Sequence, residues 1–195
     1  MDEKSALNAK LVEALSSRPW MAAYVEINHL KQLYRQGWLR AGIPRERCES
    51  VAEHIFGVAM LAWFAADAGF QDLDRDRLIR LALVHDLGEI YTGDVIPADE
   101  VPVEEKHRSE RESVQAVLGK LPRGEEYLAL WEEYERGETR EARLVRELDR
   151  LEMALQALVY GKGGFVGMDP FLASAGGAIQ STPLREVLEV IQKSR

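Results

Sequence analysis

Apolar residues recur three and four positions apart along most of the chain, and no stretch alternates apolar and polar residues for the length of a strand. Spacings of three and four place apolar side chains on one face of a helix. We therefore expect an all-α globule of about seven or eight helices. The pattern predicts these helices at residues 7–18, 24–37, 51–62, 78–88, 104–121, 127–134, 139–160 and 182–191.

Several segments between these helices carry residues that favour turns. Residues 41–50 form a predicted connector, in which Ser50 is placed to cap the helix that follows. Residues 91–102 are interrupted by glycine and proline. The glycine-rich passage 161–180 predicts a loop folded over the surface, ahead of a C-terminal helix. Because no internal repeat or domain break divides the chain, we interpret residues 1–195 as one domain.

Composition narrows the class of protein. With 195 residues, 46% hydrophobic and 30% charged, the chain can bury a real core. A net charge of −8 argues against binding to a nucleic acid polymer, which needs a basic face. The one cysteine, Cys48, cannot form an internal disulfide and fits a reducing compartment. The first ten residues lack the apolar core of a signal peptide, and the longest uncharged run, 54–66, is too short to cross a bilayer. We expect a cytoplasmic protein without a membrane segment.

Two histidines and two aspartates fall at or beside the predicted core. His54 lies on the apolar stripe of 51–62, His85 ends the stripe of 78–88 and precedes Asp86, and Asp149 flanks the stripe of 139–160. Taken singly, an inward histidine is more often hydrogen-bonded to a carbonyl, and such an aspartate more often lies at a solvated rim. Imidazole and carboxylate are, however, the ligands that borderline divalent metals accept. Together the four residues predict a metal centre with open positions for water and substrate.

Motifs around these residues resemble a known family. SVAEH ends in His54, LVHDLGE contains His85 and Asp86, and ELDRLE contains Asp149. This order is similar to that of the HD-domain metal-dependent phosphohydrolases. The longer segments RQGW, RLALVHDLGEIYTGDVIPADEVPVEEKHR and LWEEYE resemble their 5'-deoxynucleotidase branch. The matching segments span residues 24–160, and the remainder of the chain carries little of the resemblance.

The resemblance implies one catalytic divalent metal, manganese, cobalt or another first-row transition metal, held by His54, His85, Asp86 and Asp149. It implies hydrolysis of deoxyribonucleoside 5'-monophosphates to deoxynucleoside and phosphate, and a homodimer. In the family pattern, the residues at Glu89 and Asp94 lie beside the metal. Either could orient or deprotonate the attacking water, and either could protonate the departing 5'-oxygen, so their roles stay open at this stage.

The resemblance also places an arginine and a tryptophan upstream of the first histidine, against the phosphate and the sugar. Arg35 and Trp38 in RQGW are the candidates, with Arg40 as an alternative phosphate ligand. A guanidinium fork suits a phosphate dianion, and an indole against C2' would exclude a 2'-hydroxyl. Gly37 precedes this tryptophan where a bacterial relative has arginine, which affects the phosphate ligand more than the metal site. Lys106 and His107 are interpreted as structural or rim residues.

Other functions remain as alternatives. Cyclic-dinucleotide phosphodiesterases of this superfamily need several more histidines than the two that are left over, His29 and His107. Hydrolases of guanosine tetraphosphate carry a Glu-Asp pair, whereas Ile90 follows Glu89 here. Triphosphohydrolases of deoxynucleotides are usually longer. An enzyme acting on another nucleotide or phosphate ester, or a helical interaction module without catalysis, stays open, although a module of that kind has no reason to keep these polar groups.

Overall fold

The computed structural model describes residues 3–194, with side chains described from residue 9 onward. Within this range the chain forms α-helices and two short 3₁₀ helices, and the described residues contain no strand beyond one isolated bridge. The all-α prediction is therefore confirmed. The elements are α1 (Glu3–Ala14), α2 (Pro19–Ile27), η1 (Asn28–Lys31), α3 (Gln36–Arg40), α4 (Val51–Ala68), α5 (Arg75–Val84), α6 (Glu89–Thr92), η2 (Pro97–Asp99), α7 (Val103–Leu118), α8 (Gly124–Arg136), α9 (Arg140–Lys162), α10 (Asp169–Ala178) and α11 (Thr182–Lys193).

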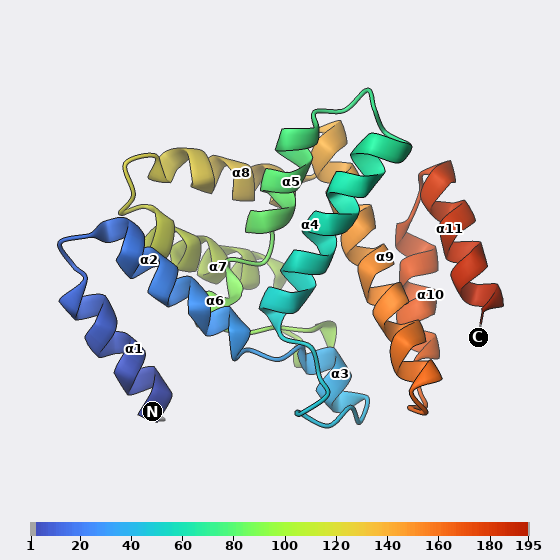
Figure 1. Ribbon diagram of the computed structural model, residues 1–195, viewed down its shortest axis with the longest axis horizontal. Coiled ribbons are helices and arrows are strands. Elements are labelled where there is room, and N and C mark those ends of the chain that lie inside the picture. The colour runs from blue at the N-terminus through green and yellow to red at the C-terminus, as the bar shows by residue number, and fades with distance from the viewer. Residues whose placement is uncertain (1–2, 195) are drawn as a thin grey trace.

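Three helices form the centre of the molecule (Figure 1). Helix α4 packs against α5 and α9, and α5 also packs against α9. Helices α7 and α8 lie on one side of this group, and α10 and α11 lie on the other, against α9. The buried apolar residues form one core cluster across these helices. The centre of the fold is thus where an inward polar side chain meets side chains from other helices.

The ends of the central helices follow from local capping. Ser50 accepts a hydrogen bond from the backbone N–H of Glu53, and the Glu53 side chain accepts one from the backbone N–H of Ser50, which makes a capping box at the start of α4. Thr139 caps α9 in the same manner, through the backbone N–H of Ala142. The predicted cap at Ser50 is present, and it places His54 in the first turn of α4.

The structure has more helices than the seven or eight expected, partly because α3 and α6 have only 5 and 4 residues. Helices this short are below the length that an apolar stripe reveals. The predicted helix at 24–37 is also divided. Tyr34 bridges Ser50, and the backbone N–H of Arg35 donates to the Glu49 carbonyl, which holds Arg35 in an extended conformation. A long-range backbone pairing thus overrides the local helical pattern.

The loop predicted at 161–180 is wrong in its second half. Residues Asp169–Ala178 form α10, with a proline in the first turn, and Leu172 and Ala175 are buried against α9. Phe171 lies against Trp38, with ring centroids 4.0 Å apart. Glycine lowers helix propensity, but burial of an apolar face outweighs this cost here. At the other end of the chain, the helix predicted at 7–18 is α1, which ends at Ala14, and the Leu7 side chain lies outside the described side chains.

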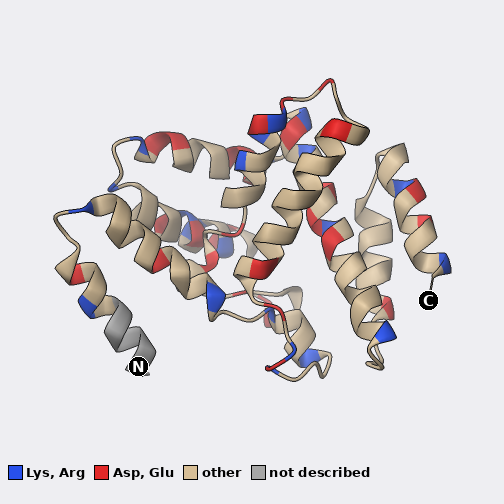
Figure 2. Cartoon of the chain, viewed as in Figure 1, with Lys and Arg blue, Asp and Glu red and all other residues tan. Residues whose placement is uncertain are grey.

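Helix α4 carries few charged residues, as Figure 2 shows. Its 18 residues have a mean hydropathy of 1.3, which is enough to cross a membrane by length and composition alone. A core helix passes the same test, and 39% of the residues of α4 are buried inside the molecule. His54 and the apolar stripe of α4 are among them, and they face the helices that pack against α4. These contacts are those of a core helix.

Candidate metal centre and active site

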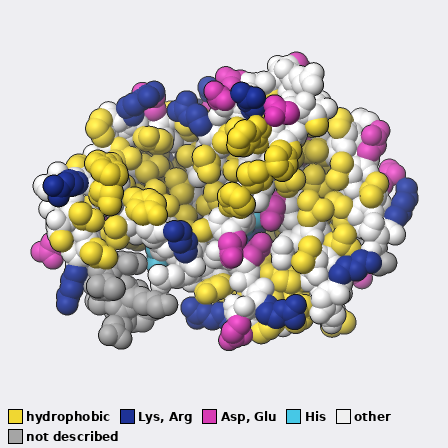
Figure 3. Space-filling view, viewed as in Figure 1, with side chains coloured by type: hydrophobic (Ala, Val, Ile, Leu, Met, Phe, Trp, Pro, Cys, Tyr) yellow, Lys and Arg dark blue, Asp and Glu magenta, His cyan; other side chains and the backbone are white. Residues whose placement is uncertain are grey.

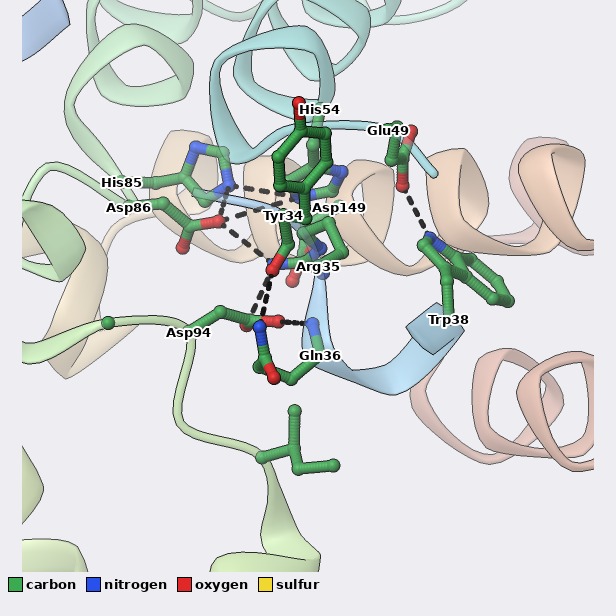
Figure 4. A network of polar contacts seen from close by, with 12 residues as sticks. Tyr34, Arg35, Gln36, Trp38, Glu49, His54, His85, Asp86, Asp94 and Asp149 are labelled. Carbon is green, nitrogen blue, oxygen red and sulfur yellow. Dashed lines mark hydrogen bonds and ion pairs between the residues drawn. The ribbon is translucent and has the colours of Figure 1, made fainter. Parts of the chain in front are cut away.

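Four side chains from the three central helices point toward one another (Figure 4). His54 is in the first turn of α4, His85 follows the last residue of α5, Asp86 comes next, and Asp149 is in the middle of α9. His54 is 0% exposed, His85 3% and Asp149 9%. The residues predicted as metal ligands are therefore brought together inside the core.

Distances between the possible ligand atoms are short. His54 Nε2 lies 3.2 Å from Asp149 Oδ1 and 3.6 Å from Asp86 Oδ2, and His85 Nε2 lies 3.2 Å from Asp86 Oδ2. The two Nε2 atoms are 3.3 Å apart. Imidazole nitrogen and carboxylate oxygen, the donor set of a first-row divalent metal, thus lie 3.2 to 3.6 Å apart here.

The surroundings of His85 fit a metal at that point. Its Nδ1 lies 2.7 Å from the carbonyl oxygen of Ala82, which can only accept a hydrogen bond. Nδ1 therefore carries a proton, and in the neutral ring the lone pair of Nε2 faces His54. A lone pair directed at another imidazole nitrogen needs a proton or a cation between them. His54, His85 and Asp149 also offer ligand atoms that all lie within 4.8 Å of one another.

The charged side chains of this centre lie close together and shift one another's pKa values. Burial alone would raise the pKa of Asp86, but His85, Arg35 and His54 together hold it well below its usual range. The pKa of Asp149 is lowered against burial in the same way, chiefly by His54. Burial and Arg35 oppose charge on His54, yet hydrogen bonds to Asp149 and Glu152 raise its pKa to about 10. Two ionised aspartates in a buried centre require positive charge beside them.

Glu89 opens α6 and is 4% exposed. Its Oε2 is buried and has no hydrogen-bond partner among the described residues. A buried polar atom without a partner is costly, so its presence in a folded protein needs an explanation, such as a bound water, ion or substrate. Burial first, and then repulsion from Asp86, raises the pKa of Glu89 well above its usual value. This carboxyl group therefore tends to hold a proton beside the centre.

Asp94 is engaged on both oxygens. Its Oδ1 lies 3.4 Å from Arg35 Nη1, and its Oδ2 accepts the backbone N–H of Gln36. Gly93, with a φ of 81°, gives the chain the turn that places Asp94 there. Arg35 Nη1 is also 3.4 Å from Asp86 Oδ2. The structure thus connects Asp94 and Arg35 to the metal centre as one network, drawn in Figure 4.

The three residues predicted to contact substrate lie in three different environments. Arg35 reaches the centre, with its side chain 16% exposed. Trp38 is 2% exposed, and its indole N–H donates to Glu49 Oε1 at 2.6 Å, so its ring faces Tyr160 and Phe171. Arg40 pairs with Asp99 at the surface and is not among the contacts of the centre. A sugar contact for Trp38 and a phosphate contact for Arg40 stay predictions.

Sequence reasoning missed two residues of this neighbourhood. Glu152 Oε2 lies 2.6 Å from His54 Nδ1, and the Tyr134 hydroxyl donates to Asp149 Oδ2 at 3.4 Å. The signal for Glu152 was present, because it lies three residues after Asp149 and therefore on the same face of α9. Tyr134 ends the predicted helix at 127–134, and its spacing alone does not indicate which group its hydroxyl meets.

Lys106 and His107 lie near the rim. Lys106 Nζ is 3.5 Å from Glu110 Oε1, with its side chain 38% exposed. The His107 ring lies over Trp131, with centroids 5.2 Å apart. Neither contact involves a predicted metal ligand, in agreement with a structural or rim role.

The described residues of this protein form an all-helical fold in which α4, α9 and the segment after α5 bring two histidines and two aspartates together. The HD domain family model matches residues 27–182, most of the chain. The chain belongs to the HD-domain family, as the motifs predict. The motifs that carry the resemblance end at residue 160. The family match continues past that residue and includes α10.

Curated relatives are named 5'-deoxynucleotidases. The 5'-deoxynucleotidase HDDC2 of Mus musculus is 43% identical over 136 residues, which cover 69% of this chain and 66% of that protein. The Homo sapiens protein of that name is 42% identical, with 69% of this chain and 64% of that protein covered. These alignments span just under two thirds of those relatives' length. The Danio rerio protein of that name is 37% identical and covers 87% of this chain and 84% of its own length.

Solved structures agree on the fold. A conserved hypothetical protein from Pyrococcus furiosus has a TM-score of 0.75 at 29% identity, covering 89% of this chain and 99% of that one. A protein from Magnetospirillum magnetotacticum, described as a predicted metal-dependent phosphohydrolase, has a TM-score of 0.69 at 29% identity, covering 90% and 93%. The chain therefore shares its fold with these two proteins over nearly its whole length.

Proposed function

We propose that this protein is a divalent-metal-dependent 5'-deoxynucleotidase, which hydrolyses deoxyribonucleoside 5'-monophosphates to deoxynucleoside and phosphate. The observation that carries the proposal is the convergence of His54, His85, Asp86 and Asp149 beside a buried, unpartnered oxygen of Glu89. The names of the curated relatives support the substrate class. A divalent cation held by the four residues would stabilise charge on phosphoryl oxygens and make a nearby water more acidic.

The geometry supports different roles for the two candidate catalytic carboxylates. Hydrolysis forms a bond from water oxygen to phosphorus and breaks the bond from phosphorus to the 5'-oxygen. One proton must leave the water, and one must reach the 5'-oxygen. Glu89 keeps an oxygen free for this transfer, whereas both oxygens of Asp94 are engaged by Arg35 and Gln36. We assign proton transfer to Glu89 and the placement of Arg35 to Asp94.

Arg35 would bind the phosphate. Its guanidinium is buried between Asp86 and Asp94, and these carboxylates keep it charged. A guanidinium presents paired N–H donors that match phosphate oxygens. With a net charge of −8, the protein needs such a local cation to hold a phosphate dianion.

A phosphate-release panel tests the proposal. Metal-stripped protein would be supplied with manganese, cobalt, nickel, zinc or magnesium and offered deoxy- and ribonucleoside mono-, di- and triphosphates. We expect release from deoxyribonucleoside monophosphates with at least one transition metal, and none without metal. Release from other phosphate esters alone would favour a different phosphohydrolase. Metal binding without any turnover would favour the non-catalytic module.

We also propose a cytoplasmic homodimer. Support for the dimer comes from large apolar side chains on one side of α4, where Phe56, Trp63 and Phe64 are 66%, 46% and 58% exposed, and from Leu83 on α5. Figure 3 shows apolar side chains gathered on this face. Exposed apolar patches of this kind mark contact surfaces. Support for the compartment is the unpaired thiol of Cys48.

Sedimentation velocity tests the dimer. We expect a dimer for the wild-type chain and a monomer for Trp63→Glu, because a charge would be buried in the interface. Val166→Glu, at an exposed residue outside α4, is the matched control and should leave the dimer intact. A monomeric wild-type protein would contradict this part of the proposal. Microscopy of a fluorescent fusion tests the compartment.

A further inference from the structure

His54 lies between two groups of carboxylates. Its Nε2 faces Asp149 at 3.2 Å, and its Nδ1 faces Glu152 Oε2 at 2.6 Å. Asp149 and Glu152 are three residues apart on α9, so one face of this helix contacts both nitrogens of the ring. Glu152 is 98 residues from His54 in the chain, and its side chain is 12% exposed. Such a short contact fixes the ring from the side opposite the metal centre.

An ionised carboxylate can only accept hydrogen bonds. Nδ1 of His54 must therefore donate its proton to Glu152, so a ring whose Nε2 has given up its proton to a metal directs the Nε2 lone pair at the centre. The other tautomer would place a hydrogen on Nε2, where a metal would bind. The carbonyl of Ala82 orients His85 in the same way through the backbone. Glu152 is the side-chain counterpart of that carbonyl, and mutation can remove it.

Gly57 provides the room for this carboxylate. It lies on α4, three residues after His54, and a Cβ added there would be 2.9 Å from Glu152 Oε1 and 3.1 Å from Glu152 Cγ. Any other residue at this position would displace the Glu152 side chain from its present place. Helix α4 thus carries a glycine, which is unfavourable in a helix interior, at the position where α9 places the carboxylate.

We propose that Glu152 is a positioning residue that holds His54 in the tautomer and orientation needed to bind a divalent metal through Nε2, with Gly57 leaving space for it. This inference rests on the metal centre of the proposed function. The rival assignment is a second cation bound by Glu152 itself, since Glu49, His54 and Glu152 also offer ligand atoms within 4.8 Å of one another. Glu49 already accepts the indole N–H of Trp38, which favours the first assignment.

Zinc affinity tests the proposal without relying on turnover. Metal-stripped full-length protein would be titrated with zinc by calorimetry, for wild type, Glu152→Gln and Gly57→Ala. Partners of this kind typically change metal affinity by about 10–100-fold, and we expect a loss in that range for both variants with one zinc bound. Glu147→Gln, on the same helix and engaged with Ser181, and Gly177→Ala, where a Cβ meets nothing within 4 Å, are the matched controls and should bind zinc as wild type does.

Nuclear magnetic resonance of the zinc-loaded protein supplies a readout that a merely structural role would not move. We expect zinc on Nε2 of His54 and a far-downfield Nδ1 proton, which shifts upfield in Glu152→Gln. Unchanged zinc affinity in Glu152→Gln, zinc on Nδ1, or a second zinc that Glu152→Gln abolishes would each overturn the proposal. If Glu152→Gln does not fold, Gly57→Ala decides, because it retains the carboxylate, and unchanged affinity there would overturn it. Wild-type protein that binds no zinc would instead refute the metal centre.

Discussion

The metal centre and the segment 35–40 beside it are built differently. His54 and Asp149 lie on long helices of the core and His85 directly follows a core helix, so the helical repeat directs each side chain toward the same interior. Segment 35–40 is a short helix preceded by an extended residue, and it sends Arg35 to the centre, Trp38 into the core and Arg40 to the surface. The direction of a side chain on a long core helix can be predicted from its spacing in the sequence. The direction of a side chain in a short segment depends instead on its tertiary contacts.

Removing a ligand on a long helix should have the largest effect. Asp149→Asn takes away a negative oxygen that faces His54, so we expect metal and activity to be lost together while the helical fold is retained. Metal content by mass spectrometry, phosphate release and circular dichroism measure the three quantities. Glu147→Gln, two residues away and paired with Ser181, is the control and should keep both metal and activity.

Glu89→Gln should separate binding from chemistry. The amide fills the same space but cannot transfer a proton, so we expect metal to be retained and kcat to fall by roughly 10²-fold or more. Asp94→Ala should also lower kcat and raise KM, because Arg35 loses the partner that positions it. Steady-state kinetics with deoxyAMP and metal analysis make the comparison. Near-normal turnover in both variants would place the activating group elsewhere.

The two arginines of the segment can be distinguished in one assay. Arg35→Gln should reduce kcat/KM by about 10–100-fold, because a hydrogen bond to a charged group contributes about 1.5–3 kcal/mol. Arg40→Gln should have little effect, since its partner is Asp99 at the surface. Kinetics of deoxyAMP hydrolysis for the two variants test this. A larger loss for Arg40→Gln would make Arg40 the phosphate ligand.

The smallest expected effect concerns the choice of sugar. Wild-type protein should prefer deoxyAMP to AMP, and Trp38→Ala should narrow the difference chiefly by improving AMP hydrolysis, if the indole crowds the 2'-position. An apolar pocket discriminates against an added hydroxyl by only about 10²-fold. We therefore expect the preference for deoxyAMP over AMP to be no larger than this, unless the site is rigid. Trp38→Phe retains an aromatic ring and controls for packing. Equal changes for both sugars would show that Trp38, which is 2% exposed, acts only in the core.

Part of this protein is determined by the sequence alone. The spacing of apolar residues specified an all-α fold. It placed His54 and His85 on apolar stripes and Asp149 beside one, because a helix repeats its direction every 3.6 residues. The motif order was sufficient to place the chain in the HD-domain family, which the family match confirms. These features depend on neighbours in the chain, and local geometry is enough to predict them.

Other features were decided by contacts between distant residues. The pairing of Tyr34 with Ser50 interrupts a predicted helix and directs Arg35 to the centre. Packing on α9 makes a helix of residues 169–178, where glycine content predicted a loop. Glu152 meets His54 across 98 residues, and only the packing of α4 on α9 brings the two together. Spacing along the chain specifies the direction of a side chain, but the partner that satisfies it depends on how the helices pack.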